Sequence, residues 1–149
     1  MIRPANVRDL DALVALENAS FKGDRITRRS FGNLLRGRSS VILADFERGV
    51  LRGYVLLFFR AGTRVGRLYS VAVAAAARGH GVGRKLVRAA ERETSRRRRD
   101  VLRLEIRKDN AASLALFRGA GYTEFGETAG YYEDGIAALR FEKALRRAA

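Results

Sequence analysis

The chain has 149 residues, enough to bury a hydrophobic core and few enough that we expect one domain over residues 1–149. It contains no cysteine and a single histidine, which excludes disulfides and thiolate–zinc sites and argues against a His-based metal centre. The first residues lack the apolar core of a signal peptide, and no stretch approaches the roughly 18 apolar residues of a membrane span. We therefore expect a soluble, cytoplasmic protein with no membrane partner.

The net charge is +14, from 30 Lys and Arg against 16 Asp and Glu, and nearly all of the basic residues are arginines. Such a charge favours a polyanionic partner, whether nucleic acid, the ribosome or a phosphorylated cofactor. An arginine-rich surface can equally be a solvated face, so nucleic-acid binding is possible but not favoured. The run at residues 96–99 closes an expected helix, where the helix dipole favours positive charge and no RNA is needed to explain it.

Apolar spacing and turn residues predict alternating strands and helices along the chain. Asp9 or Asp11 is available to cap the first helix, Gly37 ends the second, and residues 47–52 form the turn of a hairpin. In chain order, the expected elements are a strand at 2–3 ended by Pro4, helices at 10–21 and 27–35, strands at 41–46, 53–59 and 67–73, a helix at 82–97, a strand at 101–107, a helix at 111–118, and strands at 122–128 and 138–145.

This order, β-α-α-β-β-β-α-β-α-β-β, predicts an α/β (α+β) fold around a mixed sheet of six to seven strands. The strands at 67–73 and 101–107 are joined through a helix, so they should be parallel, with a right-handed crossover. The strands before them are antiparallel. A mixed sheet that splays around this parallel pair leaves a slot between its fourth and fifth strands.

The glycine-rich run at residues 78–83 lies where an apolar segment hands over to the helix that begins near Val82. Without Cβ atoms at Gly79, Gly81 and Gly83, the backbone can come close to a ligand. The first N–H groups of the helix are free to donate to phosphate oxygens, and Arg78 adds positive charge. The run therefore predicts a bound anion.

Two motifs in this order resemble those of the GNAT superfamily of acetyl-CoA-dependent N-acetyltransferases, and the likeness extends over essentially the whole chain. The first is Arg-x-x-Gly-x-Gly at residues 78–83, and the second is the Asn-x-x-Ser-x-x-Leu-Phe-x-x-x-Gly-Tyr pattern at 110–122. Leu-Glu-Ile-Arg at 104–107 and the Tyr131-Tyr132 pair are most similar to the RimI branch. That branch acetylates protein N-terminal α-amines, notably on a ribosomal protein.

The resemblance implies that acetyl-CoA is the cosubstrate and that its pyrophosphate lies on the amides around Gly81. It also implies that the strand at 71–73 pairs with the pantetheine arm and that the Val73 amide polarises the thioester carbonyl. Asn110 caps a helix and contacts the cofactor as well, whereas His80 occupies a variable position that we expect to face solvent. The implied cofactor-binding residues are Val71, Val73, Arg78, Gly79, His80, Gly81, Val82, Gly83, Arg84, Asn110, Ser113 and Phe117.

Glu105 lies in the strand that borders the slot and points opposite to Leu104 and Ile106. A carboxylate at this place can take a proton from an attacking amine, often through water. The alternative is a surface glutamate paired with Arg103 or Arg107. Strand alternation alone favours the surface pairing, and the RimI-like context makes the catalytic role at least as good.

Phe117 stands where many relatives carry a tyrosine whose hydroxyl protonates the departing thiolate, and a phenylalanine has no proton to give. Tyr131 and Tyr132 are substitutes by loop position, and their alternative role is packing at the entrance of a strand. The coenzyme thiol has a pKa of about 8.5, so its thiolate is a fair leaving group even without an acid.

These observations predict an acetyltransferase that acts by direct transfer, since no cysteine or Ser-His pair suits a covalent intermediate. A protein or peptide α-amine is the expected acceptor, because its pKa near 8 leaves it neutral more often than a lysine. Two alternatives stay open: a small-molecule amine acceptor, and a basic, catalytically weak domain that binds acetyl-CoA or RNA.

Overall fold

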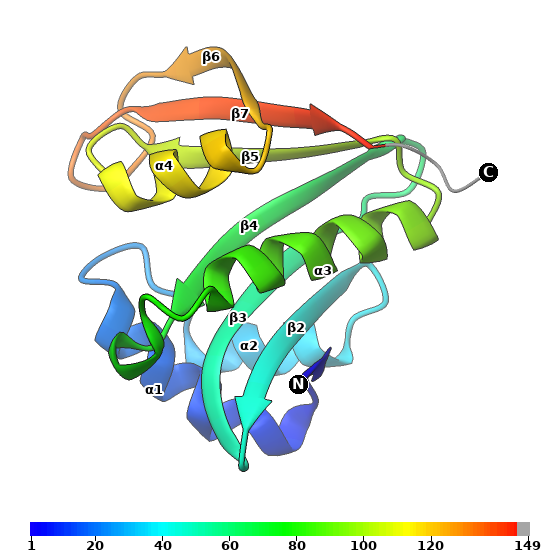
Figure 1. The fold of residues 1–149 in the computed structure, drawn as a ribbon, viewed down its shortest axis with the longest axis vertical. Coiled ribbons are helices and arrows are strands. Elements are labelled where there is room, and N and C mark those ends of the chain that lie inside the picture. The colour runs from blue at the N-terminus through cyan, green and yellow to red at the C-terminus, as the bar shows by residue number, and fades with distance from the viewer. Residues whose placement is uncertain (146–149) are drawn as a thin grey trace.

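A seven-stranded mixed sheet forms the centre of the computed structural model, which describes residues 1–145 (Figure 1). Its strand order is β1-β2-β3-β4-β5-β7-β6. The strands are β1 (Ile2–Pro4), β2 (Ser40–Glu47), β3 (Val50–Phe58), β4 (Val65–Val73), β5 (Val101–Arg107), β6 (Thr123–Thr128) and β7 (Ala138–Ala144). The helices are α1 (Leu10–Ser20), α2 (Arg28–Arg36), α3 (Val82–Arg96) and α4 (Ala111–Gly119), with short 3-10 turns η1 (Val7–Asp9) and η2 (Ala75–Ala77).

The predicted fold class and element order are confirmed, and the differences lie at element ends. Asp9, one of the two predicted caps, occupies the N-cap position of α1, but its side chain makes no capping hydrogen bond there. Its side chain instead completes the capping box of η1, whose N-cap is Asn6. A 3-10 turn, η2, separates the end of β4 from the glycine run, where the sequence showed only a continuous apolar segment. No helix within residues 1–145 is long and apolar enough to cross a membrane.

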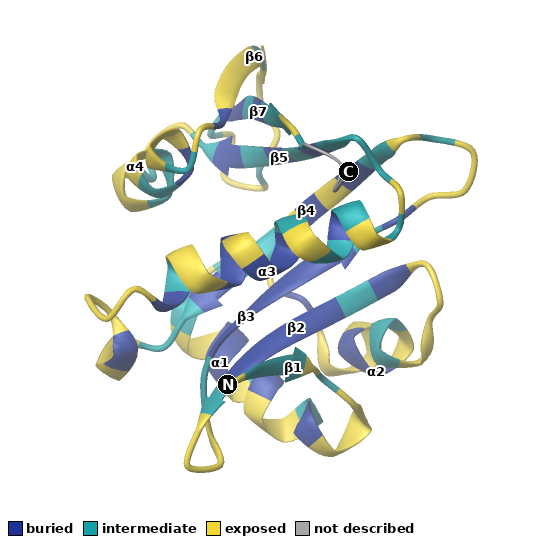
Figure 2. Cartoon of the chain, turned by 45° about the vertical axis from the view of Figure 1, so that its right-hand side comes forward, coloured by how far each residue is buried: buried dark blue, intermediate teal, exposed yellow. Residues whose placement is uncertain are grey.

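Strands β2, β3 and β4 are covered on both faces, by different helices. One core packs α1 and α2 against β2, β3 and β4 through buried side chains such as Leu13, Phe31 and Leu56, and we call this side the α1/α2 face. The other packs α3 and α4 against the same strands and β5 and β7 through side chains such as Leu86 and Leu104, and we call it the α3 face. Figure 2 shows β2 and β3 buried along most of their length and β6 largely exposed.

Strands β4 and β5 pair only at their beginnings. Residues 65–68 lie parallel to residues 101–104, and no pairing continues beyond Leu68 and Leu104. At the same point Leu57 of β3 lies opposite Leu68 whereas Leu56 lies opposite Ser70, so Tyr69 is the extra residue of a β-bulge. The bulge bends β4 away from β5, and Figure 1 shows the two strands diverging. The predicted divergence of the fourth and fifth strands is therefore present, with the bulge at Tyr69 where it begins, and we call the place where these strands separate the slot.

Candidate active site

Backbone groups dominate the part of the slot that lies near the start of α3. Gly79 and Gly81 adopt left-handed conformations, with φ of +81° and +75°, which an L side chain rarely takes. No side chain caps α3, so its first amides keep their donors free for a ligand. A Cβ at Gly83 would make only ordinary contact, 3.4 Å from Leu116 of α4, so packing does not by itself require glycine there.

The edge of β4 beyond the bulge is open. The amide of Ala74 donates to the carbonyl of Arg52 on the β3 side, at 2.8 Å. Because backbone groups alternate sides along a strand, the amides and carbonyls of Val71 and Val73 point to the other side, where β5 has diverged. Free donors and acceptors at these two residues are what pairing with an extended ligand would require.

Helix α4 begins as predicted, with the Asn110 side chain accepting from the Ser113 amide at 3.1 Å. Phe117 is only 2% exposed and packs edge-to-face on Tyr122, with ring centroids 5.3 Å apart. The Tyr122 hydroxyl donates to Glu91 at 2.8 Å. Neither ring therefore offers a proton to the slot. A general acid, if one acts there, must be another hydroxyl.

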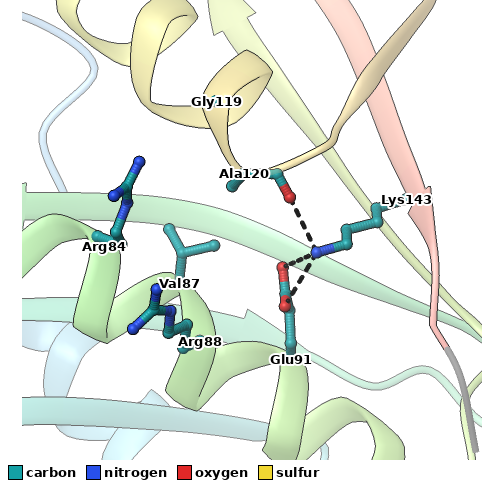
Figure 3. Close-up of a pocket in the computed structure, with 7 residues that line it drawn as sticks. All are labelled: Arg84, Val87, Arg88, Glu91, Gly119, Ala120 and Lys143. Atoms are coloured by element: carbon teal, nitrogen blue, oxygen red, sulfur yellow. Dashed lines mark hydrogen bonds and ion pairs between the residues drawn. The ribbon is translucent and has the colours of Figure 1, made fainter.

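A cavity of about 350 Å³ opens between α3 and the end of α4 (Figure 3). The ammonium group of Lys143 pairs with Glu91 at 3.1 Å and donates to the Ala120 carbonyl at 2.8 Å. Within residues 1–145, Arg84 and Arg88 have no ion-pair partner, and both border this cavity. The cavity therefore adds two uncompensated positive charges to the same side of the molecule as the start of α3. It is lined by Arg84, Val87, Arg88, Glu91, Gly119, Ala120 and Lys143.

Glu105 is the centre of a side-chain cluster on the opposite face of the slot. Its neighbours Leu104 and Ile106 are buried on the α3 face, so its own side chain, 12% exposed, projects to the α1/α2 face. One amino group of Arg67, Nη2, donates to Glu105 Oε1 at 2.6 Å and to the Tyr131 hydroxyl at 2.7 Å. Nε of Arg140 lies 3.8 Å from Glu105 Oε2.

The surface pairings considered for Glu105 do not form. Arg103 binds Glu142 at 2.7 Å instead, and Arg107 binds Asp134 and Asp109. Both arginines are thus used along the outer part of the sheet. Glu105 is left to Arg67 and Arg140, which come from β4 and β7.

The two tyrosines at 131–132 occupy different places, although their rings pack edge-to-face with centroids 4.9 Å apart. The Tyr131 hydroxyl joins the Glu105 cluster, whereas the Tyr132 ring lies under Arg107, 5.0 Å from its guanidinium carbon. Burial, with Glu105 assisting, raises the pKa of Tyr131 against the opposing effect of Arg67. Burial also raises the pKa of Tyr132, to about 12. Both hydroxyls therefore keep their protons at neutral pH, and Tyr131 is the one that reaches Glu105.

Two loops meet beside this cluster. The Asp24 amide donates to Glu133 at 3.3 Å, and the Glu133 amide donates to Asp24 at 3.3 Å, although the two residues are 109 positions apart. Gly23 allows this contact, because a side chain there would collide with Glu133. The segment between α1 and α2 and the turn after β6 therefore bound the α1/α2 side of the slot.

Several of these residues were not predicted from the sequence, and some of the predicted residues lie away from the Glu105 cluster. Arg67 and Arg140 were not predicted, since nothing near them in the chain signals that they converge on Glu105. Arg78 and His80 are both exposed on the glycine-rich loop, as expected for His80. In residues 1–145 no group of three His, Asp or Glu side chains is placed to hold a metal ion.

Residues 9–122 match the acetyltransferase (GNAT) family. This match covers most of the chain, and the chain belongs to that family. It is a GNAT N-acetyltransferase, and acetyl-CoA is the cosubstrate of the family. The free edge at Val71 and Val73 and the uncapped start of α3 suit an extended ligand that ends in phosphates.

Solved structures with the same fold include two enzymes named for ribosomal-protein acceptors. Ribosomal-protein-S18-alanine N-acetyltransferase from Escherichia coli has a TM-score of 0.88 at 22% identity, over 100% of this chain and 96% of that one. Ribosomal-protein-alanine N-acetyltransferase from Brucella melitensis has a TM-score of 0.84 at 29% identity, over 97% of this chain and 99% of that one.

A third structure, yncA from Salmonella typhimurium with its cofactor acetyl-CoA, has a TM-score of 0.84 at 24% identity, over 100% of this chain and 95% of that one. No curated protein sequence matches the chain.

Proposed function

We propose that this enzyme transfers the acetyl group of acetyl-CoA directly to the α-amine of a protein or peptide. The observation that carries the proposal is the cluster of Glu105, Arg67 and Tyr131, which lies on the α1/α2 face where β4 and β5 diverge. Acceptor and donor then approach from opposite faces of the sheet. The two RimI-like enzymes of the same fold are named for an alanine acceptor on a ribosomal protein.

The donor side is made by the glycine-rich loop and the edge of β4. Acetyl-CoA supplies the acetyl group as a thioester. Amides at Gly81, Val82 and Gly83 bind its pyrophosphate at the start of α3, and Arg78, Arg84 and Arg88 add positive charge. Val71 and Val73 pair with its extended arm, and the Val73 amide donates to the thioester carbonyl as negative charge develops there. Asn110, Ser113 and Phe117 form the adjoining α4 wall.

The acceptor side handles two protons. Glu105 accepts the proton that the amine loses, directly or through a water molecule, and Arg67 holds its carboxylate in place. Tyr131 gives a proton to the departing thiolate, in place of the tyrosine that Phe117 replaces. Tyr132 packs against Tyr131 and fixes its ring, so we assign it a positioning role.

The acceptor class is tested by offering wild-type enzyme and acetyl-CoA to peptides with varied N-terminal residues, to polyamines and to aminoglycosides. We expect acetylated peptide α-amines, located by mass spectrometry, with N-terminal alanine among the good substrates. Peptides that stay unmodified while a small amine is acetylated would contradict the proposed acceptor. The cytoplasmic location expected from the sequence stays a prediction.

The arginine run at 96–99 does not favour the alternative of an RNA-binding domain. In the run at 96–99, Arg97 donates to the Arg38 carbonyl and Arg99 to the Arg60 carbonyl, while Arg96 and Arg97 pair with Glu93. These arginines tie the loops before β2 and β4 to the end of α3. Arg96, Arg97 and Arg99 therefore have structural partners within the protein.

A further inference from the structure

A chain of three polar side chains runs from α1 through β3 to the slot. Glu17, 1% exposed, accepts from the Tyr54 hydroxyl, and Tyr54 is fully buried. The Tyr54 hydroxyl also lies 3.2 Å from Oγ of Ser70 on β4. The second oxygen of Glu17 accepts from the Ile26 amide at 2.7 Å. None of these three side chains has a role in the acetyl transfer proposed above.

With Glu17 ionised, the number of hydrogens fixes the direction of these hydrogen bonds. An ionised carboxylate only accepts hydrogen bonds, and a tyrosine hydroxyl has one proton, which Tyr54 gives to Glu17. The oxygen of Tyr54 can then only accept from Ser70, so the Ser70 proton points inward. The remaining lone pairs of Ser70 Oγ are free to accept from a donor other than Tyr54 and Glu17.

Ser70 is placed to meet such a donor at the slot. It follows the bulge residue Tyr69, in the part of β4 that has left β5, and it is partly exposed. Its cross-strand partner, Leu56, belongs to the core of the α1/α2 face. Ser70 and Glu105 therefore project to the same face, from the two strands that border the slot.

We propose that Ser70 Oγ accepts one N–H of the attacking amine, and that Glu17 and Tyr54 are positioning residues that keep Ser70 an acceptor. This inference rests on the proposed amine acceptor. A neutral primary amine has two N–H groups and one lone pair. With one hydrogen on Ser70 and the other on Glu105 or its water, the lone pair is left for the thioester carbon.

The arrangement predicts selectivity for primary over secondary amines. A secondary amine has one N–H, so it leaves one of the two acceptors unpaired in a partly desolvated site. We expect wild-type kcat/KM for a peptide with N-terminal alanine to exceed that for the same peptide with N-methylalanine by at least about 10-fold.

The test compares Ser70→Ala and Ser70→Thr on that peptide pair, with Ser40→Ala as the matched control. Ser40 also lies on a strand of the sheet, but its hydroxyl bonds the Leu34 carbonyl at the far end of β2. We expect Ser70→Ala to lose about 10-fold in kcat/KM for the primary amine and to reduce the preference to about 3-fold or less. Ser70→Thr and Ser40→Ala keep the preference. An unchanged preference in Ser70→Ala overturns the inference.

Glu17→Gln tests the direction of the hydrogen bonds from Ser70 through Tyr54 to Glu17. The glutamine oxygen accepts from Ile26, its NH₂ donates to Tyr54, and the Tyr54 proton turns to Ser70, which makes Ser70 a donor toward the slot. We expect a loss of about 10-fold in kcat/KM for the amine with an unchanged dissociation constant for acetyl-CoA.

The Glu17→Gln/Ser70→Ala double variant separates positioning from support of the fold. We expect it to be no slower than Ser70→Ala alone, whereas additive losses would show that Glu17 only supports the loop at Ile26 and would overturn its positioning role. If peptides prove unreactive and a small amine reacts, the same comparison is made with that amine and its N-methyl form. This comparison distinguishes an error in the proposed peptide acceptor from an error in the proposed role of Ser70.

Discussion

The two sides of the slot are built in different ways. The proposed donor side consists mainly of backbone groups from one continuous stretch, from Val71 through the glycine run to the start of α3. The proposed acceptor side consists of side chains from separate elements, with Arg67 on β4, Glu105 on β5 and Tyr131 in the turn after β6. A backbone site leaves a local pattern in the sequence, and a side-chain site does not. The two sides should also respond differently to substitution.

The largest expected effect is at Glu105, on the acceptor side. Glu105→Gln keeps an oxygen for Arg67 but removes the proton acceptor, so we expect kcat/KM for the amine to fall about 100-fold. The dissociation constant of acetyl-CoA should stay within about 2-fold of wild type, since the donor side is untouched. Steady-state kinetics and calorimetric titration with acetyl-CoA measure the two quantities.

Glu142→Gln is the matched control for this substitution. Glu142 lies on the same face of the neighbouring strand and pairs with Arg103 at 2.7 Å, as Glu105 pairs with Arg67. An equal loss in both variants would show that any ion pair on this face supports the rate. The proton-accepting role of Glu105 would then be wrong.

On the donor side we expect a smaller effect, and we expect it on acetyl-CoA binding, where Glu105→Gln should leave binding nearly unchanged. Gly81→Val places a β-branched side chain at φ of +75°, which distorts the loop and should weaken acetyl-CoA binding about 30-fold. Gly49→Val is the control, because Gly49 has φ of +78° in the turn between β2 and β3 and equal open space around it. Both variants should lose about 1–3 kcal/mol of stability. Weakened binding in both would mean that strain alone, and not the loop, accounts for the result.

The two tyrosines at 131–132 should differ in their contribution to the rate. Tyr131→Phe removes the hydroxyl that Arg67 and Glu105 contact, and we expect kcat to fall about 10-fold. Tyr132→Phe should change kcat less than about 3-fold. The pKa of Tyr131 is raised above its usual value of 10, so the hydroxyl is protonated throughout pH 6–9. The loss should therefore be constant across that range, and a larger loss in Tyr132→Phe would reverse the assignment.

Local signals account for what the sequence predicted of the fold. Gly37 ends α2 and Thr27 caps it, and the β-rich run at 101–107 gave β5 its observed bounds. The bulge at Tyr69 escaped prediction because a Val-Ala-Val strand is equally compatible with regular pairing. The cap at Asn6 was missed because a 3-10 turn moves the start of the first helix by one turn.

The residues of the proposed donor site follow from the sequence, and most of those of the proposed acceptor site do not. Glu105 was singled out because it lies in a RimI-like motif and strand alternation sets its face, but its partners Arg67 and Arg140 lie 38 and 35 positions away. The link from Glu17 to Tyr54 spans 37 positions and joins a helix to a strand. Contacts of this kind depend on how the sheet curves, which no single segment encodes.

The smallest expected effect concerns the stability cost of keeping a carboxylate buried on the acceptor side. Burial raises the pKa of Glu17 above its usual 4.5, against the lowering effects of the Ile26 amide, Tyr54 and the nearby Arg25. Between 4.5 and that raised value, the folded chain binds more protons at Glu17 than the unfolded chain does. The free energy of unfolding contributed by Glu17 therefore falls as pH rises through this window, by up to about 1.4 kcal/mol per pH unit, and is level above it. Glu17→Gln lacks this fall, so its stability relative to wild type should increase with pH across the window. Urea unfolding of both proteins from pH 4 to pH 8 measures the difference, and a difference that is constant with pH would show that Glu17 does not titrate differently in the folded chain.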